Sequence, residues 1–125
     1  MQQIRILDVG QCGFDGPRMC KLFTNELNAV VDQADDLDET RAKLQEGKYD
    51  VILVNRVLAM TGGSGLEVIE SLAKEGVPTK MMLVSDREDA QQEAISRGAV
   101  QGFGKAKLHD RETLELICNT ARGSA

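Results

Sequence analysis

The chain has 125 residues, of which 42% are hydrophobic and 28% charged, enough to bury an ordinary core in one domain over 1–125. A net charge of −5, three Phe, one Tyr and no Trp argue against a nucleic-acid partner, whose binding surfaces need basic and aromatic side chains. No apolar run approaches the roughly 20 residues of a membrane span, and no secretory signal opens the chain. The scattered cysteines Cys12, Cys20 and Cys118 favour a reduced, cytoplasmic protein.

Short apolar runs alternate with segments of helical spacing along the whole chain. The predicted elements, in chain order, are a strand over 4–9, a helix over 15–27, a strand over 29–31, a helix over 35–47, a strand over 50–54, a helix over 64–76, a strand over 80–84, a helix over 88–97, a strand over 100–103 and a helix from 110. This alternation predicts an α/β fold, a doubly wound parallel sheet with helices on both faces.

Several side chains have expected positions within these elements. Asp15 is expected to cap the first helix or, as the alternative, to reach the strand ends. The remaining helices are expected to bury the apolar residues of their stripes, which are Leu37, Ala42 and Leu44, then Leu66, Ile69, Leu72 and Ala73, then Ala90, Ala94 and Ile95, and finally Leu114, Ile117, Cys118 and Ala121.

The candidate site lies after the most apolar predicted strand. Four residues without a polar member, 51–54, lie between Asp50 and Asn55, as a central strand covered on both faces requires. Ligands of open α/β sheets bind outside the carboxyl ends of the strands, which is where Asn55 stands. The expected site residue is therefore an amide and not a carboxylate.

Three motifs resemble the receiver domain of two-component response regulators. YDVILVN followed by GLEVI is similar to the family's third strand, phosphoacceptor position and third helix. VSD places Ser85 at the family's hydroxyl position, and GAVQGFGK places Lys105 at its lysine position. The resemblance covers essentially the whole chain, and it implies a CheY-like, flavodoxin-like (βα)5 fold with strand order 2-1-3-4-5.

The resemblance also shows where this sequence departs from the family. The acidic pair that holds magnesium is replaced by Gly10 and Gln11, and the phosphoacceptor aspartate is replaced by Asn55. Gly102 stands at the switch aromatic, and Ala106 at the proline after the lysine. An amide has no anionic oxygen to form an acyl phosphate, and magnesium prefers carboxylate oxygens. The sequence therefore predicts no catalytic residue, no metal and no cofactor.

We expect a non-phosphorylatable pseudo-receiver, and not an enzyme, that acts as a protein–protein interaction module in bacterial signal transduction. The resemblance implies contact through the fourth helix, fifth strand and fifth helix, a face to which Gln91, Gln92, Arg97 and Gln101 belong. One alternative is a small-ligand or anion site built from Ser85, Lys105 and the N–H groups of 10–13. The other is a phosphorylatable receiver that uses Asp8 or Asp15.

The remaining polar residues leave several roles open. Ser85 and Lys105 either bond locally with Asn55 or form a working anion or partner site, and Asp86 either pairs with Lys105 or is solvated. Arg56 is equally a contact residue or a surface charge. His109 is expected at the surface, and the cysteines lack the spacing of a zinc or redox pair. The turn GQCGFDG resembles a phosphate-binding loop only loosely, and the scarcity of aromatics counts against flavin.

Overall fold

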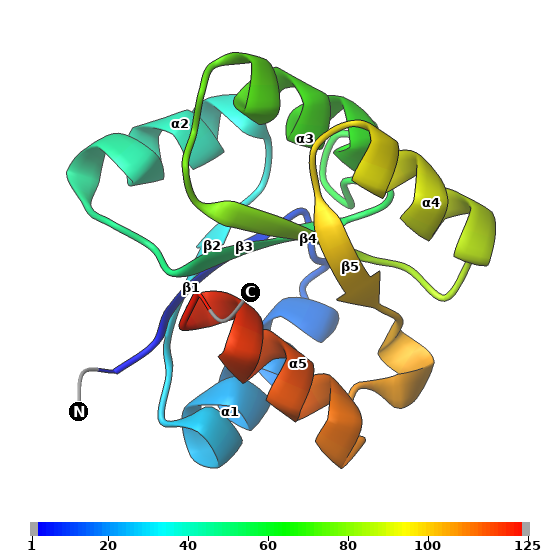
Figure 1. Ribbon diagram of the computed structural model, residues 1–125. Coiled ribbons are helices and arrows are strands. Elements are labelled where there is room, and N and C mark those ends of the chain that lie inside the picture. The colour runs from blue at the N-terminus through cyan, green and yellow to red at the C-terminus, as the bar shows by residue number, and fades with distance from the viewer. Residues whose placement is uncertain (1–2, 124–125) are drawn as a thin grey trace.

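The computed structural model describes residues 3–123, in which strands and helices alternate along the chain (Figure 1). In chain order the elements are β1 (Arg5–Val9), α1 (Asp15–Leu27), β2 (Val30–Ala34), α2 (Leu37–Glu46), β3 (Val51–Asn55), α3 (Gly65–Lys74), β4 (Lys80–Val84), α4 (Glu88–Ser96), β5 (Val100–Phe103), the 3-10 helix η1 (Lys105–Lys107) and α5 (Arg111–Ala121).

The five strands form one parallel sheet in the order β2-β1-β3-β4-β5, which confirms the predicted topology. The central strand β3 pairs with β1 and β4, and Leu53 lies opposite Asp8 in β1 and Met82 in β4. The residues from Val51 to Val54 are all buried because helices cover both faces of this strand.

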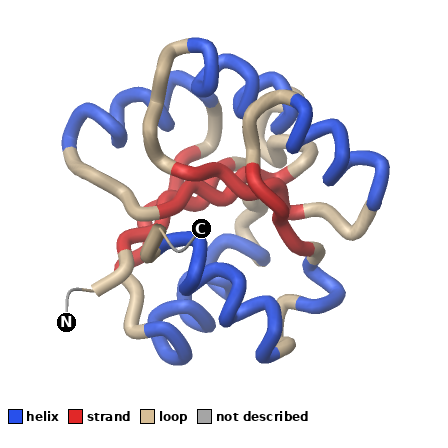
Figure 2. The backbone as a smooth tube through the Cα atoms, in the orientation of Figure 1, coloured by secondary structure: helices blue, strands red, loops and turns tan. Residues whose placement is uncertain are grey.

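The sheet is the middle of three layers (Figure 2). Helices α2, α3 and α4 cover one face, and α1 and α5 cover the other. Because side chains alternate along a strand, Leu7 and Val9 of β1 enter the core under α3, whereas Ile6 enters the core under α1 and α5. Asp8 follows the same alternation, so its carboxyl group lies on the α1 and α5 side of the sheet.

The structure corrects some predicted positions. The second strand is longer than predicted, because polar side chains suit an edge strand: Asp32 accepts a hydrogen bond from the Tyr49 hydroxyl group. In α2, Ala42 is exposed and Thr40 is buried instead. In α4, Ile95 is 39% exposed, and the side chain that is buried with the two alanines is Gln91.

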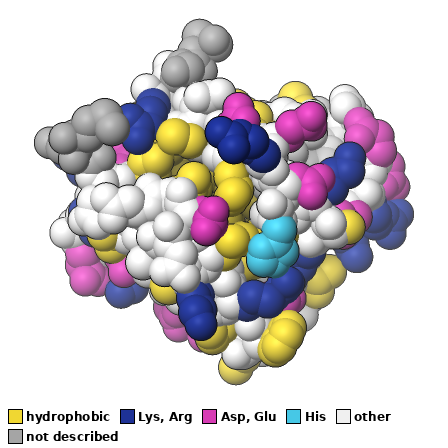
Figure 3. Space-filling view, turned by 90° about the horizontal axis from the view of Figure 1, so that it is seen from below, with side chains coloured by type: hydrophobic (Ala, Val, Ile, Leu, Met, Phe, Trp, Pro, Cys, Tyr) yellow, Lys and Arg dark blue, Asp and Glu magenta, His cyan; other side chains and the backbone are white. Residues whose placement is uncertain are grey.

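The outer surface of α1 and α5 carries a band of apolar side chains between charged ones (Figure 3). A groove of about 380 Å³ lies there, lined by Glu26, Leu27, His109, Arg111, Leu114, Glu115 and Cys118. His109 is exposed, as predicted. A bilayer-spanning helix is absent from residues 3–123, since none there combines the necessary length with an apolar sequence.

Candidate functional site

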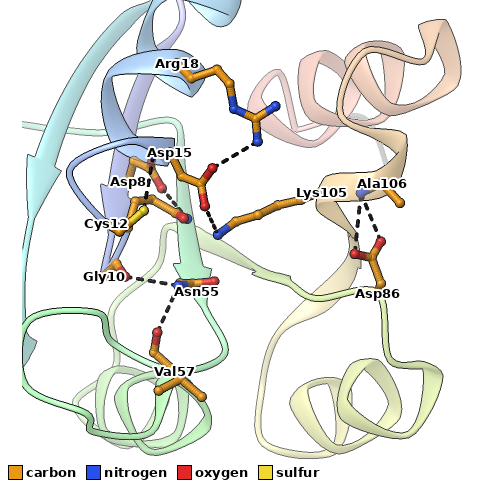
Figure 4. Close-up of polar contacts among 11 residues, drawn as sticks. Asp8, Gly10, Cys12, Asp15, Arg18, Asn55, Val57, Asp86, Lys105 and Ala106 are labelled. Carbon is orange, nitrogen blue, oxygen red and sulfur yellow. Dashed lines mark hydrogen bonds and ion pairs between the residues drawn. The ribbon is translucent and has the colours of Figure 1, made fainter.

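The predicted site residues Gly10, Asn55 and Lys105 lie near one another at the carboxyl edge of the sheet (Figure 4). A cavity of about 290 Å³ opens between the ends of β3, β4 and β5 and is lined by Asn55, Arg56, Val57, Val84, Ser85, Asp86, Arg87 and Lys105. Gly10 and Gln11 do not line this cavity, because both belong to the loop behind Asn55. Three of the five predicted positions therefore share one cavity.

The Asn55 side chain joins two loops by donating hydrogen bonds. Its Nδ2 atom lies 3.1 Å from the carbonyl oxygen of Gly10 and 2.8 Å from that of Val57. The backbone N–H of Ala59 donates to the same Gly10 oxygen at 3.0 Å. A carboxylate could replace neither side-chain bond, because it has no proton to donate. The expectation that Ser85 and Lys105 bond Asn55 is wrong, since both have other partners.

Gly10 holds a backbone conformation and a contact that suit glycine alone. Its φ is +81°, in the left-handed region, and an added Cβ would lie 2.5 Å from Leu58 Cδ2. An acidic side chain at this position would therefore strain the backbone and displace Leu58. The next residue, Gln11, is buried and turns its amide toward Asp8 instead of toward the cavity.

Lys105 is held by Asp15, across the cavity from Asn55 (Figure 4). Its Nζ atom lies 2.7 Å from Asp15 Oδ2, and Asp15 Oδ1 accepts from Arg18 at 3.0 Å. The Lys105 ammonium group, and secondarily Arg18, lower the pKa of the Asp15 carboxyl group. Asp15 is therefore not the cap of α1; Phe14 has the N-cap position, and the thiol of Cys12 accepts from the Asp15 N–H at 3.3 Å.

Ser85 and Asp86 are occupied by local backbone contacts. The Ser85 Oγ accepts from the N–H of Arg87 at 3.2 Å, which is an ordinary turn contact after a strand. The Asp86 carboxylate accepts from the N–H of Ala106 at 3.2 and 3.4 Å. The alternative that Asp86 pairs with Lys105 is thus wrong, since Lys105 bonds Asp15, and Ser85 is one of the residues that line the cavity.

A second carboxyl group, Asp8, lies beneath the loop that follows β1. It is fully buried, and its Oδ1 accepts from Gln11 Nε2 at 3.0 Å. Burial raises the pKa of Asp8 to about 7, although Gln11, Lys105 and Gln33 act in the opposite direction. Asp8 was predicted to lie within the first strand, but its partner could not be identified from the sequence.

The space beside Gly102, the glycine at the predicted switch position, is occupied by a side chain from the neighbouring helix α4. Gln91 of α4 inserts its side chain, donating to the carbonyls of Leu83 at 2.9 Å and Ser85 at 3.1 Å, and accepting from the Gly102 N–H at 3.1 Å. A Cβ at Gly102 would lie 2.1 Å from the Leu83 oxygen. Gln91 is 3% exposed, so its expected place on the contact surface is wrong.

Magnesium does not fit the residues present at this edge. Gly10 offers no side chain, Asn55 points its N–H groups at carbonyls, and Gln11 donates to Asp8. Within residues 3–123, no group of three or more His, Cys, Asp or Glu side chains could hold a metal ion. The Lys105 and Asp15 charges already neutralise each other, so no group of anionic oxygens is left for a hard cation.

Comparison with known proteins identifies the family. Residues 15–117 match the family described as the response regulator receiver domain, and the chain belongs to this family. It is 31% identical over 86 residues to the transcriptional regulatory protein ResD of Bacillus subtilis (strain 168), a match that covers 69% of this chain and 32% of ResD. The chain thus spans about a third of the length of this curated relative.

Solved receiver structures share the fold at low sequence identity. The receiver domain of the Francisella response regulator 1452 has a TM-score of 0.82 and 15% identity, over 98% of this chain and all of that one. The receiver domain of NtrX from Brucella abortus has a TM-score of 0.81 and 18% identity, over 96% and 99%. Receiver domains are signalling modules that interact with partner proteins in two-component systems. That class of protein is what the fold and the family match establish for this chain.

Proposed function

We propose that this chain is a receiver that is not phosphorylated and that acts as a protein–protein interaction module in bacterial signalling. The observation that carries the proposal is the Asn55 amide, which ends the central strand and donates both its protons to loop carbonyls. Aspartyl phosphate formation needs a carboxylate nucleophile, and this position has none. We further propose that the domain comprises 1–125, works in the cytoplasm without a cofactor and is not an enzyme.

The pairing of Lys105 with Asp15 supports the same proposal. The Lys105 ammonium group is bonded to the Asp15 carboxylate at 2.7 Å and not to Asn55, so the lysine has no anionic partner at the phosphoacceptor position. Two observations weigh against a phosphorylatable receiver with substituted acids. Asp8 is fully buried, which closes it to a phosphodonor, and Asp15 is engaged by both Lys105 and Arg18.

The direct test is incubation with acetyl phosphate and magnesium, followed by intact-mass measurement. We expect no alkali-labile mass increase of one phosphoryl group on the wild-type chain. A receiver with the complete set of acidic residues, treated in the same tube, serves as the positive control. A stoichiometric adduct on this chain would overturn the proposal.

We propose that the partner binds the face formed by α4, β5 and α5. Gln92 and Gln101 are exposed there, whereas Arg97 is half-buried and pairs with Glu93 at 3.1 Å. The Gln91 amide ties α4 to the edge of β4 and β5, which supports a face that needs no switch to form. A photo-crosslinking residue at Gln92 or Gln101 is expected to capture a protein partner, and one at the exposed Lys21 of α1 is not. Capture from Lys21 alone would contradict this assignment.

A second candidate function is binding of a small anion in the cavity. Three basic residues, Arg56, Arg87 and Lys105, line it, with Asp86 as the only acid. A thermal-shift screen with phosphate, sulfate and small carboxylates tests this candidate, with Arg56→Ala and Lys105→Ala as the variants. A midpoint that stays constant across the panel counts against it.

A further inference from the structure

The proposed function makes no use of Asp8, the most buried carboxyl group among the described residues. Asp8 lies inside β1, where its strand neighbours are Gln33 of β2 and Leu53 of β3. Its side chain is 0% exposed and lies on the apolar side that α1 and α5 cover. Charged groups are almost never buried in this way unless they are paired with an opposite charge.

The hydrogen bonds around Asp8 are incomplete in one particular way. The Gln11 amide donates to Asp8 Oδ1 at 3.0 Å. The other oxygen of each group, Asp8 Oδ2 and Gln11 Oε1, is buried and has no hydrogen-bond partner among the described residues. Both atoms are acceptors when Asp8 is ionised, so neither can satisfy the other. A proton on Oδ2 converts that oxygen into a donor and permits a second bond between the same two groups.

The charged groups near Asp8 do not remove the need for this proton. Lys105 of η1 is the cation that lowers the pKa of Asp8, but its Nζ is bonded to Asp15 Oδ2 at 2.7 Å. Asp15 of α1 adds a negative charge, and Arg18 is bonded to Asp15 as well. From β2 the facing group is the neutral Gln33, whose side-chain amide lowers the pKa of Asp8 but donates to the Gly16 carbonyl at 3.2 Å, so Asp8 Oδ2 is left without a hydrogen bond. Asp8 is therefore surrounded by a compensated ion pair and by amides.

We propose that Asp8 and Gln11 form a proton-operated latch on the loop between β1 and α1. With the proton in place, the carboxyl and amide groups hold each other by two hydrogen bonds and fix the loop beneath Asn55. Ionisation leaves a buried charge and two acceptors without donors, and Asp8 then competes with Asp15 for Lys105. The latch does not depend on whether the chain is phosphorylated. It makes the carboxyl edge of the sheet sensitive to pH, because the second hydrogen bond between Asp8 and Gln11 exists only while Oδ2 carries a proton.

The test is an NMR pH titration of the full chain between pH 3.5 and 8.5, reading the Asp8 carboxyl carbon and the Gln11 side-chain amide. We expect both signals to titrate together with a midpoint near 7. The backbone amides of Gly10 and Gly13 are expected to follow with the same midpoint. An Asp8 carboxyl that titrates in the ordinary range near pH 4, or a Gln11 amide that does not respond, would overturn the proposal.

Two variants identify the source of the transition. Asp8→Asn keeps one donor and one acceptor beside Gln11, so its spectrum is expected to match the low-pH form at every pH and to lose the transition. His109→Gln removes the only imidazole of the chain and is expected to leave the transition unchanged. A transition that survives in Asp8→Asn or disappears in His109→Gln would refute the latch. Asp15→Asn, which frees Lys105, is expected to lower the midpoint, and an unchanged midpoint would refute the competition for Lys105.

Discussion

At the residue scale, the chemistry of the carboxyl edge depends on side-chain amides. These amides donate hydrogen bonds at positions where phosphoryl transfer would need carboxylates. Asn55 and Gln11 each donate a hydrogen bond from a side-chain amide, to Gly10 and to Asp8 respectively. An amide and a carboxylate have nearly the same shape, so the difference between them lies in the proton and the charge. Exchanging one for the other in this structure therefore changes stability before it changes activity.

The first prediction concerns Asn55→Asp. The carboxylate would face the carbonyl oxygens of Gly10 and Val57 without a proton to share, and we expect a loss of about 2–4 kcal/mol in the free energy of unfolding. Asn55→Ala, which removes the bonds without adding a charge, is expected to lose about 1–2 kcal/mol. Urea denaturation at pH 7 measures both. If Asn55→Asp is as stable as the wild type, the amide does not hold the loops.

The second prediction follows from Asp8. The pKa of Asp8 is about 7 in the folded chain and 3.8 in the unfolded one, so the folded state binds the proton more tightly. The stabilisation is complete below pH 4 and is lost as the pH rises to 7 and beyond. Asp8→Asn is expected to match the wild type at low pH and to exceed it at pH 8, by up to about 4 kcal/mol.

Thermal unfolding followed from pH 4 to pH 8 measures the effect of Asp8→Asn. The matched control is Asp110→Asn, an exposed carboxyl group before α5, for which no widening difference from the wild type is expected. A stability difference between Asp8→Asn and the wild type that stays constant over the same interval would contradict the sign derived for Asp8.

The sequence predicted which residues lie at the site, but it did not predict their hydrogen-bond and ion-pair partners. Asn55, Ser85 and Lys105 were placed together from the sequence because the ends of parallel strands meet at one edge. The Lys105 and Asp15 pair joins residues 90 positions apart, and the choice between Asp15 and Asp86 depends on side-chain geometry. Gln11 was predicted only as an absent acid, since its buried bond to Asp8 needs the local turn of the chain.

At the element scale, the edge between α4 and β5 is held by one amide and one glycine. The register between β4 and β5 shifts between Met82 and Val84, and the side chain of Gln91 bonds the backbone of both strands there, at Leu83 of β4 and at Gly102 and Phe103 of β5. A larger residue at 102 has no room, because the Leu83 carbonyl lies against the glycine. The edge therefore has one arrangement in which all of these polar groups are paired.

The third prediction is that Gly102→Ala is strongly destabilising, by about 2–4 kcal/mol. The added Cβ would lie 2.1 Å from a backbone oxygen, which only a shift of the strand can relieve. Gly13→Ala is the control, because nothing lies within 4 Å of its Cβ position and a change within about 0.5 kcal/mol is expected. Thermal unfolding of the two variants distinguishes them, and equal losses would argue against the contact.

The fourth prediction is that Gln91→Glu destabilises α4 by about 2–3 kcal/mol, since a carboxylate cannot donate to the carbonyls of Leu83 and Ser85. Hydrogen exchange of the α4 amides should rise in this variant. Gln92→Glu, on the exposed side of the same helix, is expected to leave exchange within a factor of about three, as a change of a few tenths of a kcal/mol implies. Similar exchange in the two variants would show that Gln91 is not the residue that holds the helix.

The boundaries of the elements show why sequence patterns succeeded for some segments. β4 and β5 begin and end where predicted, because apolar runs bounded by polar or glycine residues are clear signals. The burial of Gln91 and the exposure of Ile95 reverse the order that hydrophobicity predicts. The space beside Gly102 and the backbone groups there that need the Gln91 amide as a partner explain that reversal. Neither can be inferred from the sequence of one segment alone.

At the scale of the whole molecule, the receiver fold is complete although the family's acidic site is not. Separate apolar cores fill the two faces of the sheet, and both draw on β1, β3 and β4. The alternation of strands and helices predicted the parallel sheet with helices on both faces, and the resemblance to the receiver family added the strand order 2-1-3-4-5.

The fifth prediction is that magnesium leaves the thermal midpoint unchanged. With no cluster of acidic side chains for the ion among residues 3–123, we expect the same midpoint in EDTA and in millimolar magnesium chloride. Calcium and manganese serve as further comparisons, and the same receiver used as the phosphorylation control should respond. A saturable rise with magnesium alone would mean that the cation finds ligands this arrangement does not provide.

The Gly10 carbonyl, which accepts from both Asn55 and Ala59, has a consequence for engineering. Restoring the family's acids one at a time would pass through unfavourable intermediates. An aspartate at 55 loses two bonds, and an aspartate at 10 enters a left-handed conformation and meets Leu58. Each single change is therefore expected to lower the stability of the chain. An acidic site engineered at this edge is expected to need compensating changes in the loops that contact the Gly10 carbonyl and Leu58.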